Sequence, residues 1–101
     1  MKFQWSSSKN ADNRRKHFLD FEDAFEIFKG PILTEVDDRV DYGEIRTKGI
    51  GFLREIVVVL IFTEREGDII RIISLRKATK YEREKFYKFL QDRLGSIENN
   101  V

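Results

Sequence analysis

The run Ile56-Val-Val-Val-Leu-Ile-Phe62 constrains the fold of this chain more than any other segment. Its residues are apolar and mostly β-branched, a composition that favours a strand with both faces buried. A turn that contains glycine, residues 64–68, follows this run, and residues 69–75 are again largely apolar. The two segments therefore predict a central β-hairpin whose faces need cover from other parts of the chain.

Three further segments predict strands. Residues 3–5 and 32–36 alternate between the two faces of a strand, and the second segment runs into the acidic turn Asp37-Asp38. Residues 44–50 form a strand pattern of mixed polarity, in which Gly49 and Gly51 predict a bend or bulge. Together with the hairpin, these segments predict an antiparallel sheet of about four strands.

The remaining residues predict helices at both ends of the chain. Residues 8–17 are polar and favour a helix that is exposed over most of its surface. Asp20 is placed to cap a second helix that Gly30-Pro31 ends. Thr79 and Glu82 form the capping box of a last helix, which ends near Gly95 before a frayed tail, residues 96–101. The residues expected to face the core are Phe21, Ala24, Phe25 and Phe28 in the second helix and Tyr81, Phe86, Phe89, Leu90 and Leu94 in the last.

The order of these elements indicates an α+β fold, and 101 residues fit one domain, residues 1–101. The chain has no cysteine and one histidine, which excludes a disulfide framework and a thiolate nucleophile and argues against a zinc site. We therefore expect no metal and no cofactor. No apolar run is long enough to span a bilayer and no secretion signal is visible, so we expect a cytoplasmic protein without membrane contact.

The charged residues nearly balance, with 19 Lys and Arg against 18 Asp and Glu and a net charge of +1. Bulk charge therefore does not indicate a nucleic-acid-binding protein. The charges are nevertheless segregated, because acidic residues concentrate between residues 20 and 41 whereas residues 71–88 are predominantly basic. Any contact with nucleic acid must come from this local basic cluster, where the last strand meets the last helix.

The sequence resembles the BrnT family of toxins from about residue 3 to residue 87. The segments that carry the resemblance are Phe3-Gln-Trp5, Asn13-Arg-Arg-Lys-His17, Phe21-Glu-Asp-Ala24 with Phe28, Glu44-Ile-Arg46 with Gly49, Thr63-Glu-Arg65, and Arg71-Ile-Ile-Ser-Leu-Arg-Lys-Ala-Thr79 with Glu82, Arg83 and Tyr87. The resemblance implies a RelE-like fold and a ribonuclease toxin of a bacterial type II toxin–antitoxin module. It also implies a BrnA-type antitoxin as partner, RNA as substrate, and a higher-order complex that contacts its operator DNA only through the antitoxin.

Two positions depart from the family pattern. Phe18 follows the Lys16-His17 pair where the family usually has glycine, and Leu75 stands where the family has a small alanine. The first departure can change the turn between the two N-terminal helices, and with it the placement of His17.

RNA cleavage without a metal uses the 2′-hydroxyl beside the scissile phosphate as the nucleophile. The protein must help to remove its proton, neutralise charge on the phosphate and protonate the leaving 5′-oxygen. Arginine and lysine suit the phosphate, and histidine has a reference pKa near neutrality. With the resemblance, the candidate catalytic residues are His17, Arg46, Arg71, Arg76 and Lys77, and the weaker RNA-binding candidates are Lys16, Glu44, Arg65, Lys80 and Tyr87.

Each candidate also has a simpler interpretation. A histidine near a helix C-terminus is favoured there by its positive charge, and exposed ion pairs are common. Taken alone, Arg71 is expected to pair with Glu64 or Glu66, and the spacing of Tyr87 favours a place in the core. The same glutamates and Glu44 are alternatives to histidine as the general base.

Strand alternation limits how these residues can meet. In a regular strand Arg71, Leu75 and Lys77 share one face, while Arg76 lies on the other. A single site therefore predicts that the chain leaves regular pairing around Leu75, so that Arg76 and Lys77 turn towards the face of Arg71.

The sequence also leaves two other classes of function open. One is a non-catalytic module that binds a partner or RNA, and the other, with weak support, is a DNA-binding regulator. For the antitoxin we expect a particular surface. The helices are predicted to cover only one face of the sheet, so that the antitoxin covers the other apolar face together with the basic site.

Overall fold

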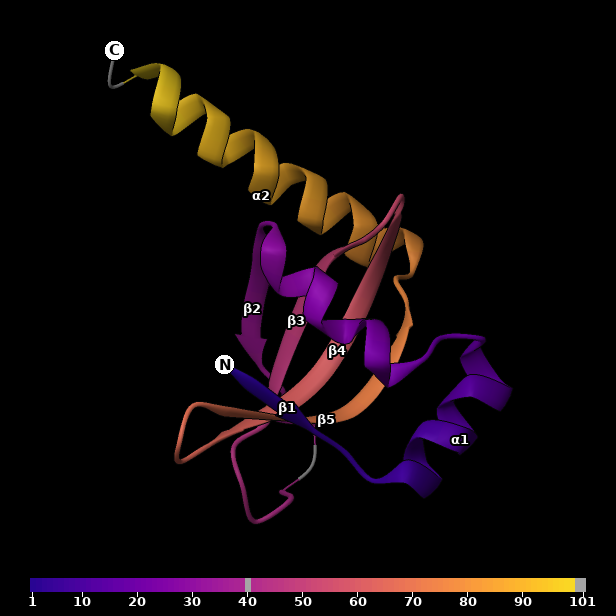
Figure 1. Ribbon diagram of the computed structural model, residues 1–101. Coiled ribbons are helices and arrows are strands. Elements are labelled where there is room, and N and C mark those ends of the chain that lie inside the picture. The colour runs from indigo at the N-terminus through magenta and orange to yellow at the C-terminus, as the bar shows by residue number, and fades with distance from the viewer. Residues whose placement is uncertain (40, 100–101) are drawn as a thin grey trace.

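The computed structural model describes residues 1–39 and 41–99 (Figure 1). The elements are β1 (Lys2–Gln4), α1 (Ser7–His17), the 3₁₀ helix η1 (Phe21–Lys29), β2 (Ile32–Val36), β3 (Thr47–Leu53), β4 (Ile56–Arg65), β5 (Ile69–Lys77) and α2 (Lys80–Asn99). The α+β class predicted from the sequence is confirmed, with two helical segments before the main strands and one helix after them. No helix in the described part of the chain is long and apolar enough to cross a membrane.

The sheet has five strands in the order β1-β5-β4-β3-β2. Strands β2 to β5 form the expected antiparallel part, with the predicted hairpin β4–β5 at its centre. Strand β1 adds a fifth strand that pairs in parallel with β5, from Lys2 opposite Ile69 to Gln4 opposite Arg71. The N-terminal ammonium group lies 2.7 Å from the carboxylate of Asp68, which holds the start of β1 beside the turn of the hairpin.

One face of the sheet, here called the α1 face, packs against α1 and η1. Its buried strand residues include Val58, Leu60 and Leu75, which lie in one apolar cluster with Phe21 and Ile27 of η1. Burying a side chain of this size contributes about 1.5–3 kcal/mol. This cluster therefore fixes the N-terminal helical segments against the strands.

The opposite face, here called the α2 face, packs against the C-terminal helix. Val57, Val59 and Ile61 of β4 form a second cluster with Phe86, and Phe89 lies at its edge. Residues 57–62 of β4 are all 5% exposed or less, so both faces of the central strand are covered. The expectation that the helices cover only one face is wrong, because α2 packs on the second face through Phe86. Figure 1 shows α2 crossing one end of this face and extending past the sheet.

Segment η1 begins as predicted but differs in its winding. Asp20 caps it, since the Asp20 carboxylate accepts a hydrogen bond from the backbone N–H of Glu22 at 3.0 Å. The fully buried residues are Phe21, Ala24 and Ile27, at most 1% exposed. Their spacing of three suits a 3₁₀ helix, which has three residues per turn, and it leaves Phe25, predicted to be core, 43% exposed.

Strand β3 lies three residues further along the chain than predicted. Glu44 and Arg46 precede it, and both Gly49 and Gly51 are regularly paired within it, so the expected bend is absent. A Cβ atom at Gly51 would lie 2.9 Å from the Ile27 side chain. The glycine therefore serves close packing of η1 on the strand instead of a change in strand direction.

The last helix is longer than predicted. Its capping box is confirmed: the backbone N–H of Thr79 donates to the Glu82 carboxylate at 2.8 Å, and the N–H of Glu82 donates to the Thr79 hydroxyl at 3.2 Å. The helix passes Gly95 and ends at Asn99, whereas the sequence predicts an end near Gly95, and residues 100–101 lie outside the described residues. One glycine lowers helix stability by only about 1 kcal/mol, which is too little to end an established helix.

Candidate functional site

Asn13 positions α1 against the sheet. It is buried, at 6% exposed, and its side-chain amide donates to the backbone carbonyl of Leu75 at 2.8 Å. The N–H of Leu75 donates back to the Asn13 oxygen at 3.1 Å. Because β1 pairs only with residues 69–71, this amide takes the place of a strand at the next part of the β5 edge. The end of α1 is thereby fixed beside the end of β5.

Sequence reasoning did not identify this role of Asn13. It is the buried residue of an otherwise polar helix, and its partners include residues 62 positions away. Hydrophobic periodicity carries no signal for such a contact. The only signal in the sequence that could have identified this role is that Asn13 belongs to a segment, residues 13–17, that resembles the family.

A cleft of about 460 Å³ opens where the ends of α1 and β5 meet. We call it the His17 cleft, and its lining residues are Lys16, His17, Phe18, Arg76, Lys77 and Thr79. Four of the ten candidate residues from the sequence line this cleft, from two elements about 60 positions apart. Within residues 1–39 and 41–99, no carboxylate lies within 4.0 Å of the side-chain nitrogens of Lys16, His17 or Lys77. The cleft therefore presents positive charge that the described residues leave unneutralised.

A β-bulge sets which face Arg71 and Arg76 occupy. Ser74 pairs with Ile61 and Ile72 pairs with Phe62, so Ile73 is the extra residue. The bulge brings Arg71 and Arg76 to the same α2 face, opposite Thr63 and Val59 respectively.

The predicted departure from pairing near Leu75 is wrong in position. Pairing continues to Lys77, because β4 is long enough to bond the whole of β5, and Lys77 stays on the α1 face with Leu75. Arg71 and Arg76 are also four strand positions apart, roughly 13 Å, so sharing a face does not bring them to one point. Arg76 and Lys77 still meet at the His17 cleft because the strand ends there.

Arg76 is held by a buried carboxylate. Its guanidinium donates to both oxygens of Glu82, at 2.7 and 2.9 Å, and Glu82 is 5% exposed. Lys48 contributes a third charge at 2.8 Å from Glu82. The hydrogen bonds from Arg76 lower the pKa of Glu82 far below its ordinary value against the opposing effect of burial, with further help from Lys48 and the Thr79 N–H. The Arg76 fork is therefore fixed in orientation by two hydrogen bonds.

Three other candidates form a separate group at the opposite end of β3 and β4. Glu44 lies 3.5 Å from Arg46 and 3.7 Å from Arg65. The Arg46 guanidinium stacks 3.6 Å from the ring centroid of Tyr42, and its Nε is buried without a hydrogen-bond partner among the described residues. This group neutralises much of its own charge and lies outside the His17 cleft.

The last candidates are placed singly. Arg71 donates to the Gln4 side chain at 3.3 Å and forms no ion pair with Glu64 or Glu66 within the described residues. Lys80 is the first residue of α2, next to the cleft residue Thr79, and its side chain is 85% exposed. Tyr87 is 46% exposed on α2, so its expected place in the core is wrong, and it does not line the cleft.

Phe18 ends α1 in the left-handed conformation, with φ 58° and ψ 29°, and its N–H donates to the Arg14 carbonyl. This is the conformation that glycine favours at a helix end. Phenylalanine therefore does not remove the glycine-type turn, and His17 keeps its place at the mouth of the cleft.

Replacing Phe18 by glycine is expected to raise the free energy of unfolding by about 0.5–1 kcal/mol, because the left-handed strain is relieved and the exposed ring loses little packing. The measurement is the urea midpoint at constant m-value. Phe18→Ala keeps the strain and should show no such gain, and a lower midpoint for Phe18→Gly would contradict the argument.

No group of three or more histidine, aspartate or glutamate side chains within residues 1–39 and 41–99 is arranged to hold a metal ion. The His17 cleft itself is lined by three cationic side chains and one imidazole.

Comparison with known proteins identifies a family and a similar solved structure. Residues 5–82 match the model of the family described as the ribonuclease toxin BrnT of type II toxin–antitoxin systems. The fold is similar to the crystal structure of the ribonuclease toxin BrnT of Brucella abortus, with 30% sequence identity and a TM-score of 0.62 over 79% of this chain and 99% of that chain. No curated protein matched the sequence. The family match ends within the first turn of α2.

Proposed function

Because the chain belongs to the BrnT family of ribonuclease toxins of type II toxin–antitoxin systems, we propose that it is an endoribonuclease that cleaves RNA without a metal ion. The observation that carries this proposal is the convergence of His17 from α1 with Arg76 and Lys77 from β5 on one cleft. An imidazole beside cations is the set of groups that internal cleavage of RNA requires.

In the proposed reaction the 2′-hydroxyl of one nucleotide attacks the adjacent phosphorus, and the bond from phosphorus to the 5′-oxygen breaks. Two proton transfers accompany this exchange, one from the attacking 2′-hydroxyl and one to the leaving 5′-oxygen. His17 carries one of them and solvent water carries the other. Lys77 and Lys16 stabilise the negative charge that develops on the phosphate. Arg76, whose fork is oriented by Glu82, binds the phosphate through its remaining N–H donors.

The partners follow from the family. We propose that a BrnA-type antitoxin neutralises the chain, that RNA is its substrate, and that DNA contact of a higher-order complex runs through the antitoxin. Because both faces of the sheet are covered by the chain's own helices, the antitoxin surface proposed here is the cationic cleft itself and not an open apolar sheet face. Free toxin of this kind would arrest growth.

The test is RNA cleavage by the purified chain in EDTA. We expect fragments with 2′,3′-cyclic phosphate and 5′-hydroxyl ends, because attack by the neighbouring hydroxyl leaves those ends. Addition of antitoxin should stop cleavage. Intact RNA in EDTA together with cleavage after addition of Mg²⁺ would contradict the metal-free mechanism.

A second candidate function is a module that binds RNA or a partner without cleaving. The observation in its favour is the pairing of Arg76 with Glu82. Two guanidinium N–H groups donate to this carboxylate and are therefore not available to a phosphate. RNA that stays intact with and without metal, yet binds to the chain, would favour this candidate.

A further inference from the structure

Phe18 is unusual in both exposure and backbone. Its side chain is 87% exposed, more than any other large apolar side chain in the described residues. Its backbone is left-handed, which is unfavourable for a bulky residue. The ring of Phe18 therefore gains little from packing, although its backbone conformation is strained. Strained residues of this kind cluster at functional positions.

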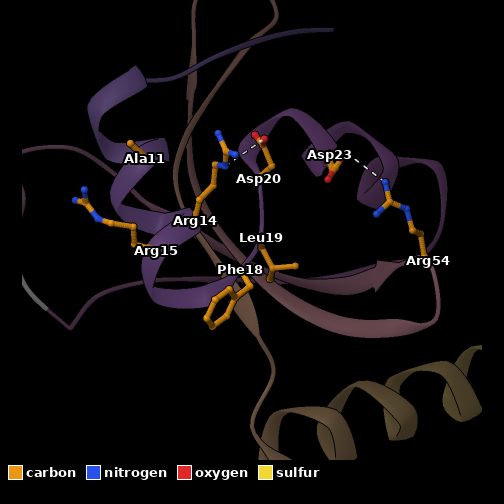
Figure 2. Close-up of a pocket in the computed structure, with 8 residues that line it drawn as sticks. All are labelled: Ala11, Arg14, Arg15, Phe18, Leu19, Asp20, Asp23 and Arg54. Atoms are coloured by element: carbon orange, nitrogen blue, oxygen red, sulfur yellow. Dashed lines mark ion pairs between the residues drawn. The ribbon is translucent and has the colours of Figure 1, made fainter.

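Phe18 also lies between two clefts. Besides the His17 cleft, it lines a cleft of about 690 Å³ beside the start of η1, which we call the Arg54 cleft (Figure 2). The residues of the Arg54 cleft are Ala11, Arg14, Arg15, Phe18, Leu19, Asp20, Asp23 and Arg54. Figure 2 shows the Phe18 ring pointing away from the carboxylates of Asp20 and Asp23. The ring therefore borders both clefts and does not face the acids of the Arg54 cleft.

The arginines of the Arg54 cleft are only loosely paired. Arg14 lies 3.8 Å from Asp20, and Arg54 lies 3.3 Å from Asp23 and 3.4 Å from Glu26. Arg15 pairs with Asp12 on the same helix, and all three arginine side chains are at least 64% exposed. Exposed ion pairs of this kind are weak and are exchanged readily for a phosphate. Each guanidinium has five donors, so most remain free for a second anion.

We propose that Phe18 is a base-stacking residue for single-stranded RNA, whose backbone runs from the arginines of the Arg54 cleft to the cations of the His17 cleft. This inference rests on the proposed function, since it assigns a further contact to the same substrate. An aromatic face between cationic grooves is the arrangement that binds single strands. A protein partner fits less well, because Leu19 and Ala11 are the only aliphatic residues among the described residues that line the two clefts.

The test uses a short single-stranded RNA with 2′-O-methyl groups throughout, which binds but cannot be cleaved, and a 2-aminopurine placed at successive positions. Phe18→Leu, which keeps apolar bulk but removes the π face, is expected to raise Kd roughly 5- to 150-fold. It should also abolish the quenching of 2-aminopurine by stacking. Phe18→Tyr should bind as the native chain does.

Two further variants separate stacking from damage to the fold. Phe18→Gly is expected to be more stable than the native chain and still to lose affinity, so weak binding there cannot come from unfolding. Phe25→Leu, in the exposed aromatic of η1, is the matched control and should leave Kd unchanged.

The inference is overturned if Phe18→Leu and Phe18→Gly bind the probe as tightly as the native chain, or if the native chain does not bind it. Loss of antitoxin affinity with unchanged RNA affinity would also overturn it and assign the ring to a protein contact. Because the probe cannot react, Phe18-dependent binding by a chain that cleaves no RNA would reject only the proposed catalysis. Cleavage with Phe18-independent binding would reject only the stacking.

Discussion

His17→Ala is expected to slow RNA cleavage by roughly 10²- to 10⁴-fold, the range that removal of a general acid or base produces. The imidazole is partly exposed in the cleft, and its side chain makes no hydrogen bond with another described residue. Its loss should therefore leave the fold intact. The rate constant is measured with excess enzyme on a labelled RNA, which separates the chemical step from product release.

Lys9→Ala is the matched control for this variant, since Lys9 is an exposed cation on the same helix outside both clefts. It should cleave at the native rate. A native rate for His17→Ala, with far-UV circular dichroism unchanged in both variants, would show that another group carries the proton transfer.

Glu82→Ala is expected to lower the free energy of unfolding by about 2–4 kcal/mol. The carboxylate is buried, and its removal leaves Arg76 and Lys48 beside each other without their shared anion. The effect is set below the 3–5 kcal/mol of a fully buried pair because both cations keep some exposure. The loss is measured by urea unfolding. Glu84→Ala, at an exposed position of the same helix, is the control, and we expect it to change the free energy of unfolding by no more than about 0.5 kcal/mol.

The same carboxylate makes stability depend on pH in a definite direction. Hydrogen bonds from Arg76 hold the folded-state pKa of Glu82 well below that of the unfolded chain, so the unfolded chain binds the proton more tightly. Its contribution is complete above the unfolded pKa, about 4.3, and is lost as the pH falls below that value. The native chain should therefore lose more stability between pH 6 and 3 than Glu82→Gln does, and equal losses would contradict this account.

The ion pairs of Glu82 with Arg76 and Lys48 limit which substitutions can test catalysis. Arg76→Ala tests a candidate catalytic residue but also removes the main partner of a buried carboxylate. Lost activity in Arg76→Ala would then mix a chemical effect with a structural one. His17 and Lys77 give cleaner tests because neither is paired with an acid among the described residues.

Much of the fold follows from local patterns. The apolar run of β4 and the capping box of Thr79 and Glu82 are signals within a few residues, and both elements form as predicted. The misplaced start of β3 and the winding of η1 have a tertiary cause, because Gly51 and the buried spacing of Phe21, Ala24 and Ile27 reflect packing of one element on another. Local patterns do not encode that contact.

The candidate site divides in the same way. Residue type and the family resemblance pointed to His17, Arg76 and Lys77, and these meet at one cleft. The resemblance did not separate them from Arg46, which precedes β3, or from Arg71, which lies four strand positions from Arg76. Neither separation can be read from the sequence before the strand pairing is known. The local sequence indicates that Glu82 caps the last helix. Its second role, as the ion-pair partner of Arg76, depends on where Arg76 lies after folding.

The amide of Asn13 has a consequence for the time at which the protein becomes harmful to the cell that makes it. Asn13 and Leu75 are 62 positions apart, so α1 gains its partner only after residue 75 of 101 has been synthesised. Closing so long a loop is a late event in folding. A chain whose translation stops before residue 76 carries His17 without the cations of β5, so it has no assembled cleft.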